Sequence, residues 1–355
     1  MRAGAPETAP RPAAAPRPEN GDLATVVVPA FDEEACIEGC LSSILGQDHA
    51  ALQVVVIDGG STDGTRRIVE ALRARDPRIE LLTNPSGRIP VSLNLGLAAA
   101  RGRWLVRVDA HSTVPPDYVR VLVGHLVSGR WGGVGGRKDG VAATRTGRAI
   151  AAALGSRAGV GNSAYHYAEL PQQTDHVPFG AYPVRLLREL GGWDEDLEAN
   201  EDYELDLRIR RDGHELLLDP AIRIRWRSKE TIGALAGQYR RYGRGKADVA
   251  RKHPSSLGLR HLAAPLLVAG AIPWSIALVL VPWVAAALAA VYAALILGAS
   301  IVAATKARDL GLVPTIAAAL TTMHVAWGVG FWEGLLRGTS RTETRTRDDG
   351  GTLPA

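Results

Sequence analysis

Asp109 and His111 directly follow the apolar run Trp104–Val108. If that run is a strand, side chains two residues apart along its extended continuation point the same way. A carboxylate and an imidazole would then lie together at the edge of a sheet, where oxygen and nitrogen ligands suit a divalent cation that holds a diphosphate. Taken alone, the same residues are also compatible with a helix cap beside a surface histidine.

Two acidic turns upstream follow apolar runs in the same manner. The first comes after residues 26–28 and reads Pro29, Ala30, Phe31, Asp32, Glu33 and Glu34. One of two alternatives for this turn is an ordinary helix start, with Asp32 as the cap and the two glutamates favoured by the helix dipole; the other is a ligand-binding turn. In the second turn, Asp58 ends an apolar run and precedes two glycines. Its carboxylate can accept a hydrogen bond from the ring N–H of a nucleobase, and the glycines let the backbone approach a planar ring.

Basic and acidic residues elsewhere extend this set. Arg88 and Arg107 can contact phosphate, or they serve a structural purpose. Glu201 and Asp202 begin an expected helix after the turn Gly191–Glu195. Carboxylates favour the first turn of any helix, but one placed there can also take the proton from an acceptor hydroxyl. The segment Gln238–Lys246 combines tyrosines with arginines, and it can close over a diphosphate or lie on anionic headgroups.

Short apolar runs alternate with helical patterns over the first 110 residues. The expected strands are Leu23–Val28, Gln53–Ile57, Ile79–Leu82 and Trp104–Val108, and the expected helices are Glu33–Leu45, Thr65–Arg75 and Ser92–Ala100. Fully apolar strands between amphipathic helices predict an α/β domain whose mostly parallel sheet has helices on both faces. Ligands bind such sheets beyond the carboxyl ends of the strands, where the acidic turns fall.

The C-terminal region has a different character, because residues 262–304 contain no charged side chain. At 1.5 Å per residue this run is about twice as long as a bilayer core is thick. Pro282 near its middle predicts two membrane helices joined by a tight turn. After the charged interruption Lys306–Asp309, residues 312–332 predict a third span. Three spans place an arginine-rich tail outside the cell, against the positive-inside tendency (Arg337, Arg341, Arg345 and Arg347).

The expected organisation has four parts. Residues 1–22 form a disordered tail without the apolar core of a signal peptide, so the following domain should stay in the cytoplasm. Residues 23–255 form the α/β domain, 256–335 the membrane domain and 336–355 a polar tail. The net charge of +4 is too small to indicate nucleic acid. The two cysteines, Cys36 and Cys40, lack CxxC spacing and are expected to be reduced and packed.

Together and in this order, the motifs between residues 23 and 245 resemble the family 2 glycosyltransferases, which have the GT-A fold. The segments Arg107–Ser112 and Gln238–Gly243 resemble the membrane-bound subgroup associated with succinoglycan-type exopolysaccharide synthesis. The resemblance implies that the donor's base and ribose are bound by Pro29, Phe31, Glu33 and Asp58, with Arg88 near its phosphates. It implies that Asp109 and His111 bind the diphosphate through Mg²⁺ or Mn²⁺.

The same resemblance assigns the downstream motifs. Asp202 would be the catalytic base, with Glu201 beside it. The acceptor site would be shaped by Trp193, Asp194 and Glu195. The residues that loosely match the QxxRW element of processive synthases are Gln238, Arg241 and Tyr242. Two departures stand out: His111 occupies the second position of the usual Asp-x-Asp, and Tyr242 replaces the usual Trp, which puts processivity in doubt.

The function expected from these residues is a membrane-anchored, inverting and metal-dependent glycosyltransferase. Its donor would be a nucleotide sugar, with a UDP-sugar as the first expectation. Its acceptor would be a lipid-linked sugar or a polysaccharide. A divalent cation would stabilise the charge on the departing diphosphate. One alternative is a polyprenyl-phosphate glycosyltransferase, whose acceptor phosphate needs no base, so that loss of Asp202 would matter less. The other is a non-catalytic membrane subunit that binds a nucleotide sugar.

Overall fold

The computed structural model describes residues 23–337, so the N-terminal tail and residues 338–355 of the polar tail lie outside the described part. The described chain divides into two compact units, each presented here by itself. The first contains residues 23–141, 162–193 and 205–227, and the second contains residues 142–161, 194–204 and 228–337. Segments 142–161, 194–204 and 228–255, which the sequence assigns to the α/β domain, thus pack with the C-terminal helices.

The first unit is built on a sheet whose parallel part matches the strands expected from the sequence. These strands are β1 (Ala24–Ala30), β2 (Leu52–Asp58), β3 (Ile79–Thr83) and β4 (Trp104–Arg107), in the order β3-β2-β1-β4. Pro29 lies within β1 although it has no N–H to donate. It is tolerated because β4 pairs with β1 only as far as Val27, so the ladder on that side has already ended.

The remaining strands make the sheet mixed. They are β5 (Ser112–Thr113), β6 (Trp131–Val141), β7 (Gln172–Thr174), β8 (Ala181–Pro183) and β9 (Glu215–Arg227). β8 runs antiparallel between β4 and β6, while β6 and β9 are parallel to each other. The short β5 pairs antiparallel with the end of β9. Side chains of β9, which is distant in sequence, therefore lie next to the segment that follows β4.

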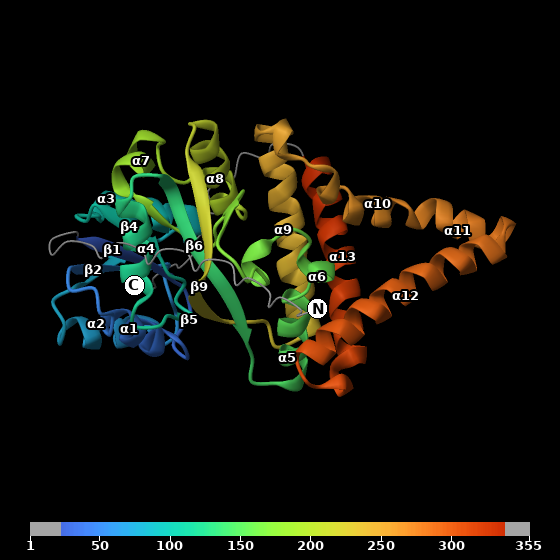
Figure 1. The fold of residues 1–355 in the computed structure, drawn as a ribbon, viewed down its shortest axis with the longest axis horizontal. Coiled ribbons are helices and arrows are strands. Elements are labelled where there is room, and N and C mark those ends of the chain that lie inside the picture. Colours follow the sequence, from blue (N-terminus) through green and yellow to red (C-terminus); the bar gives the residue numbers. More distant parts are fainter. Residues whose placement is uncertain (1–22, 338–355) are drawn as a thin grey trace, which may run out of the picture. The chain divides into compact units, whose positions relative to one another are not determined.

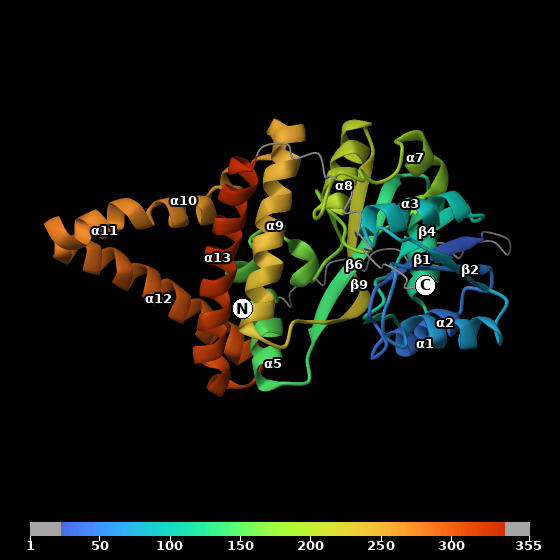
Figure 2. The same cartoon turned by 180° about the vertical axis from the view of Figure 1, so that it is seen from behind.

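Helices cover both faces of this sheet, as expected for the GT-A fold. They are α1 (Ile37–Leu45), α2 (Thr65–Arg73), α3 (Ile89–Ala99), α4 (Tyr118–Val127) and α7 (Val184–Glu189). Figures 1 and 2 show α1 and α2 on one face and α3 and α7 on the other. The core between sheet and helices includes Val27, Ile57, Leu93, Leu105 and Trp193. Short 3₁₀ turns occur elsewhere, one of them at Ala164–His166.

The second unit is helical. Its helices are α5 (Arg145–Leu154), α6 (Arg157–Val160), α9 (Ile232–Lys252), α10 (Ala263–Ala269), α11 (Ala271–Leu280), α12 (Pro282–Lys306) and α13 (Val313–Leu336). Helix α8 (Glu201–Arg211) begins in this unit and ends in the first. Two helical segments, Pro282–Lys306 and Leu310–Leu336, are long and apolar enough to cross a membrane. A pair bent by 45°, Leu259–Ala269 with Ala271–Leu280, passes the same test only when its two helices are taken together, as a broken span or a re-entrant loop.

Glycines bring α9 and α13 into direct backbone contact. A Cβ at Gly330 would clash with the backbone oxygen of Arg240, and one at Gly243 would clash with the backbone oxygen of Trp327. Arg240 also donates from Nε to Glu333 Oε2 at 2.8 Å. Small residues at a helix crossing let the backbones approach closely and increase dispersion contacts. Helix α9 is therefore fastened along its length to α13.

Candidate functional site

The turns after β1 and β2 brace one another. The backbone N–H of Asp32 donates to Ser61 Oγ at 3.0 Å, and the N–H of Thr62 donates back to Asp32 Oδ1 at 2.7 Å. Asp32 has a φ of 51°, and α1 begins only at Ile37. The expectation that Asp32 caps the helix is therefore wrong, because its carboxylate is used to hold the neighbouring turn.

Asp58 and Phe31 form a polar and aromatic pair at this edge of the sheet. Asp58 is buried, accepts from the N–H of Ser61 at 3.1 Å and lies 3.6 Å from Arg66. The Phe31 ring, 55% exposed, lies over Gly59, where an added Cβ would sit 3.3 Å from it. An exposed ring beside a buried carboxylate can stack on a planar base while the carboxylate accepts from its ring N–H.

Asp109 and His111 lie in a tight turn between β4 and β5, not on the extended continuation of the strand. β4 ends at Arg107, and the N–H of Ser112 donates to the backbone oxygen of Asp109 at 2.9 Å, which closes the turn. The expected geometry, with both side chains on one face of an extended segment, is therefore wrong. Arg107 Nε donates to Asp109 Oδ1 at 3.1 Å, which agrees with the structural alternative for Arg107.

His111 is held between a carboxylate and an indole. Its Nδ1 lies 2.8 Å from Glu33 Oε1, and the indole N–H of Trp226 donates to its Nε2 at 2.8 Å. Because an indole N–H can only donate, Nε2 must be the unprotonated nitrogen, and Nδ1 carries the proton shared with Glu33. Both ring nitrogens are thus engaged within the protein, and a metal ion at either would have to replace one of these bonds.

Asp109 is the carboxylate here that could hold a divalent cation, with substrate oxygens completing the coordination shell. Within residues 23–337, no group of three or more His, Cys, Asp or Glu side chains could hold a metal ion by itself. Mg²⁺ is commonly bound by one or two carboxylates together with substrate phosphates. Burial opposes ionisation of Asp109, but the positive charges of Arg107 and Lys138 outweigh it and lower the pKa of that carboxyl. A role for His111 as second ligand stays a prediction from the resemblance, and it requires His111 to give up its bond to Glu33 or Trp226, so we expect Asp109 to contribute more to metal binding.

Lys138 and two aromatic rings complete this part of the site, and sequence reasoning missed them. Lys138 Nζ lies 3.8 Å from the ring centre of Trp226 and 4.7 Å from that of Phe179. Phe179 has a φ of 50°, a left-handed backbone that is costly for a bulky residue. The alternation of Ile222, Ile224 and Trp226 with exposed arginines is the one sequence signal that could have placed Trp226 on a buried face.

A buried carboxylate fixes the segment that carries Phe179. Asp206 accepts from His176 Nδ1 at 2.7 Å, from the N–H of Val177 at 2.8 Å and from the hydroxyl of Tyr182 at 3.0 Å. Three donors satisfy this fully buried group, as a buried charge requires. Asp206 therefore positions the segment from residue 176 to residue 182 and does not face a substrate.

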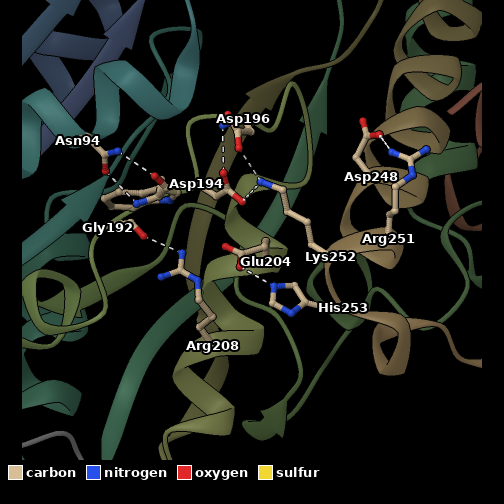
Figure 3. Close-up of polar contacts among 11 residues, drawn as sticks. Asn94, Gly192, Asp194, Asp196, Glu204, Arg208, Asp248, Arg251, Lys252 and His253 are labelled. Atoms are coloured by element: carbon tan, nitrogen blue, oxygen red, sulfur yellow. Dashed lines mark hydrogen bonds and ion pairs between the residues drawn. The ribbon is translucent and has the colours of Figure 1, made fainter. Parts of the chain in front are cut away.

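Trp193 is a core residue. Its side chain is 2% exposed, and its backbone is held by the Asn94 side chain, which donates to its oxygen and accepts from its N–H, both at 2.8 Å. Arg208 donates to the backbone oxygen of Gly192 at 2.7 Å, also visible in Figure 3. Any influence of Trp193 on an acceptor must therefore act through the turn that it anchors.

In the second unit, the segment from Asp194 to Glu204 is fastened to α9 and the residues after it. Lys252 donates to Asp194 at 2.5 Å and to Asp196 at 3.0 Å, and Glu204 meets His253 at 2.8 Å (Figure 3). Burial lowers the pKa of Lys252, but the two aspartates outweigh it and raise the pKa overall. Two more predicted residues, Glu195 and Glu201, lie in the same segment.

Asn200, two residues before the predicted base, contacts helix α9. Its side-chain amide donates to the backbone oxygen of Tyr242 at 3.0 Å, and its φ is 63°. Glu201 and Asp202 then form the first turn of α8, as the sequence predicts. Within α9, Gln238 donates to the hydroxyl of Tyr242 at 3.0 Å, while Arg241 is exposed. The segment before Asp202 and the QxxRW-like residues are thus brought together.

The remaining predicted donor residue, Arg88, precedes α3. Its backbone oxygen accepts from Asn84 Nδ2 at 2.9 Å, which fixes the entry to the helix. Phosphate contact by its side chain stays a prediction.

Comparison with known proteins shows which family has this arrangement. Residues 25–189 match the model of the family described as glycosyl transferase family 2. The succinoglycan biosynthesis protein ExoA of Rhizobium meliloti (strain 1021) is 32% identical over 314 residues, which is 88% of this chain and 94% of that protein. The chain belongs to glycosyltransferase family 2.

Two further proteins are similar to this family 2 glycosyltransferase. One is a dolichyl N-acetyl-alpha-D-glucosaminyl phosphate 3-beta-D-2,3-diacetamido-2,3-dideoxy-beta-D-glucuronosyltransferase of Methanococcus voltae, 24% identical over 64% of this chain and 74% of that protein. The other is the solved mannosyltransferase PcManGT from Pyrobaculum calidifontis in complex with GDP-Man and Mn²⁺. It is 23% identical, covers 88% of this chain and 89% of its own, and superposes with a TM-score of 0.62. This likeness confirms the GT-A fold.

Proposed function

We propose that this family 2 glycosyltransferase moves a sugar, with inversion, from a nucleotide-sugar donor to a lipid-linked or polysaccharide acceptor in exopolysaccharide synthesis. One observation carries the proposal. Acidic side chains follow three neighbouring strands of the sheet: Asp58 after β2, Glu33 after β1 and Asp109 after β4. Such an edge is where open α/β sheets bind ligands, and the exposed Phe31 ring lies beside it. The similarity to ExoA supports the exopolysaccharide assignment.

The donor would be held by this edge of the first unit. Phe31 would stack on the base, Asp58 would accept from the base ring, and Glu33 would lie near the ribose. Asp109 would bind the divalent cation, Mg²⁺ or Mn²⁺, which stabilises negative charge on a departing diphosphate. The neighbouring cations Arg107 and Lys138 keep the Asp109 carboxylate ionised for this role.

The acceptor would be activated by the first turn of α8. Asp202 would take the proton of the acceptor hydroxyl, with Glu201 beside it, and Asn200 would hold the turn in place through Tyr242. A single base acting on the face opposite the leaving group gives one displacement and inversion at the anomeric carbon. Gln238 and Arg241, on the same helix as Tyr242, would contact the donor or the sugar.

We also propose that the protein is bound to the cell membrane, with the catalytic part facing the cytoplasm. The long apolar helices α12 and α13 support this location. The relative from Methanococcus voltae has a dolichyl-linked sugar phosphate in its name, which supports a lipid-linked acceptor. A sugar hydroxyl on such an acceptor needs a base, whereas a bare polyprenyl phosphate, the alternative acceptor, does not.

The experiment is to incubate the purified full-length protein in detergent with Mn²⁺ and a panel of nucleotide sugars. We expect a UDP-sugar to be consumed, and GDP-mannose forms the second arm because the structural neighbour binds it. Release of nucleoside diphosphate that rises when lipid-linked sugar is added supports the proposal. Tight donor binding without any release, under all these conditions, would instead identify a non-catalytic nucleotide-sugar-binding subunit.

A further inference from the structure

The apolar region of the second unit contains a hairpin that is exposed over its outer part. Helices α10 and α11 form one arm, α12 forms the other, and Figure 1 shows α11 and α12 meeting at a tip. Around the tip, Val279 is 80% exposed, Leu280 73% and Trp283 75%. Trp274 on α11 donates its indole N–H to the backbone oxygen of Ala285 on α12 at 3.1 Å, which ties the arms together. Residues so apolar and so exposed require a lipid environment.

The free part of this hairpin is too short to cross a bilayer. On the first arm, Trp332 of α13 donates to the backbone oxygen of Pro265, and the Val268 side chain still packs against Gly328 of α13, so the arm leaves α13 only after Val268. On the second arm, Tyr292 already contacts His324 of α13 at 3.1 Å. The exposed stretch of residues 271–291 therefore leaves about ten residues in each arm. At 1.5 Å per residue each arm reaches about 15 Å, which is half of a hydrocarbon core of about 30 Å.

The tip of the hairpin lacks the polar residues that a turn exposed to water on the opposite side of the membrane would need. Residues 276–291 include no charged side chain and no polar one. A hairpin that crossed the bilayer would place this turn in the opposite aqueous phase. Charged residues occur instead at the two bases of the hairpin: Arg260 and His261 before it, Lys306 and Arg308 after it. Both bases are therefore suited to the same, cytoplasmic surface.

Helix α13 has polar neighbours that a span cannot have. Nε2 of its middle residue His324 donates to the backbone oxygen of Ala158 in α6 at 2.8 Å, next to the exposed Arg157. Its C-terminal half packs on α9, whose charged residues are Arg240, Arg241, Arg244, Lys246, Asp248, Arg251 and Lys252. Because α9 is locked to α13, a spanning α13 would carry these charges into hydrocarbon, where ionised side chains are strongly disfavoured.

We propose that α13 lies along the membrane surface together with α9, and that residues 271–291 form a re-entrant hairpin that enters only one leaflet. The residues before α10 and the end of α13 then both remain on the cytoplasmic side. This placement removes the conflict that three spans create, because the arginine-rich C-terminal tail returns to the side where such residues are favoured. The inference rests on the proposed membrane association and concerns how the protein enters the bilayer.

The experiment labels single cysteines in the full-length protein in native membranes, in a Cys36→Ser background. Leu170→Cys marks the catalytic side, Leu336→Cys the end of α13 and Val279→Cys the tip; all three side chains are exposed. A membrane-impermeant maleimide is applied to intact cells and to inside-out vesicles. We expect Leu170→Cys and Leu336→Cys to react only in vesicles, and Val279→Cys to react in neither until detergent is added.

Other labelling results would indicate a hairpin that crosses the bilayer or a protein that is not bound to the membrane. Reaction of Val279→Cys in intact cells would show that the hairpin crosses the bilayer and would overturn the proposal, as would reaction of Leu336→Cys there. Recovery of the protein in the soluble fraction would instead contradict membrane association itself. A nitroxide at position 279, tested for collisions with oxygen and with a water-soluble nickel chelate in vesicles, gives its depth independently. A position near the bilayer middle is expected, and one at the far headgroups would contradict the proposal.

Discussion

Asn200 and Tyr242 are joined by a hydrogen bond of 3.0 Å from a side-chain amide to a backbone oxygen, across 42 residues of sequence. The bond ties the turn before Asp202 to helix α9, and the left-handed backbone of Asn200 sets the direction in which that turn enters α8. The position of the predicted base is thus determined by a helix that is itself fastened to α13.

Asn200→Ala should destabilise this turn by about 2 kcal/mol, since it loses a hydrogen bond and places an alanine at positive φ. Asn200→Gly is the matched control because it keeps the backbone conformation and loses only the bond. We expect the glycine variant to retain more transfer activity and a higher melting temperature in detergent than the alanine variant. Equal effects of the two substitutions would show that the backbone conformation is unimportant.

Asp202→Asn should lower transfer by about 10²–10⁴-fold while nucleotide binding stays nearly unchanged, because only the proton acceptor is removed. Glu201→Gln, one residue away in the same helical turn, is the comparison and should have a smaller effect. The measurement is kcat with saturating donor and acceptor, together with the Kd of the nucleoside diphosphate. Near-normal turnover of Asp202→Asn would rule it out as the base and favour an acceptor phosphate.

Asp109→Asn should weaken the binding of Mn²⁺ in the presence of nucleoside diphosphate by more than about tenfold, because it removes the charged ligand. His111→Ala should weaken it much less, since both imidazole nitrogens are already bonded to Glu33 and Trp226. Free Mn²⁺ can be followed by electron paramagnetic resonance. A loss in His111→Ala as large as that in Asp109→Asn would mean that His111 leaves Trp226 to bind the metal. Chelation of the metal should abolish transfer in the unmodified protein.

Gly330→Ala should destabilise the packing of α9 on α13 by about 1–3 kcal/mol, because the new methyl group would press on the backbone oxygen of Arg240. Gly298→Ala in α12 is the control, since a Cβ there meets nothing within 4 Å. Thermal unfolding in detergent measures both. We further expect Gly330→Ala to reduce transfer while donor binding is retained. A Gly330→Ala protein as stable as Gly298→Ala would contradict the tight helix contact.

Cys40 should resist maleimide over about pH 7 to 9, whereas Cys36 should react. Burial, helped by the charge of Asp109, raises the pKa of the Cys40 thiol far above its usual value. A raised thiol pKa keeps the neutral form as the pH increases, and only the thiolate reacts appreciably. Cys36 is half-buried and accessible at the start of α1. Mass spectrometry of the folded protein should find one modified cysteine, and two would show that α1 opens.

The parallel strands could be predicted because strands buried on both faces are continuous apolar runs, as in Val54–Ile57. The strand β6 could not be predicted, because its sequence Trp-Gly-Gly-Val-Gly-Gly contains neither a continuous run of apolar side chains nor a clear alternation of apolar and polar ones. Its partner β9 brings Trp226 to His111 over 115 residues. That contact depends on the register of distant strands, which local patterns do not contain, so the expected metal ligand acquired an unexpected partner.

The part of the site around the proposed base was predictable only where it depends on local sequence preferences. The acidic first turn of α8 follows from carboxylates at a helix start, which is a local preference. The residues that hold it, Lys252 and His253, lie about fifty positions downstream and resemble ordinary surface charges in the sequence. The long apolar helices were evident from composition, but composition does not distinguish a membrane span from a helix that lies beside a charged neighbour.

The division of the chain also limits how its parts can be recombined. The backbone passes between the two units five times, after residues 141, 161, 193, 204 and 227. A hybrid made by joining the front of one relative to the back of another would therefore mix both units wherever the junction lies between residues 141 and 227. If donor and acceptor binding are divided between the units as proposed, they can be exchanged cleanly only by grafting whole sets of segments, and a single recombination event cannot replace one without the other.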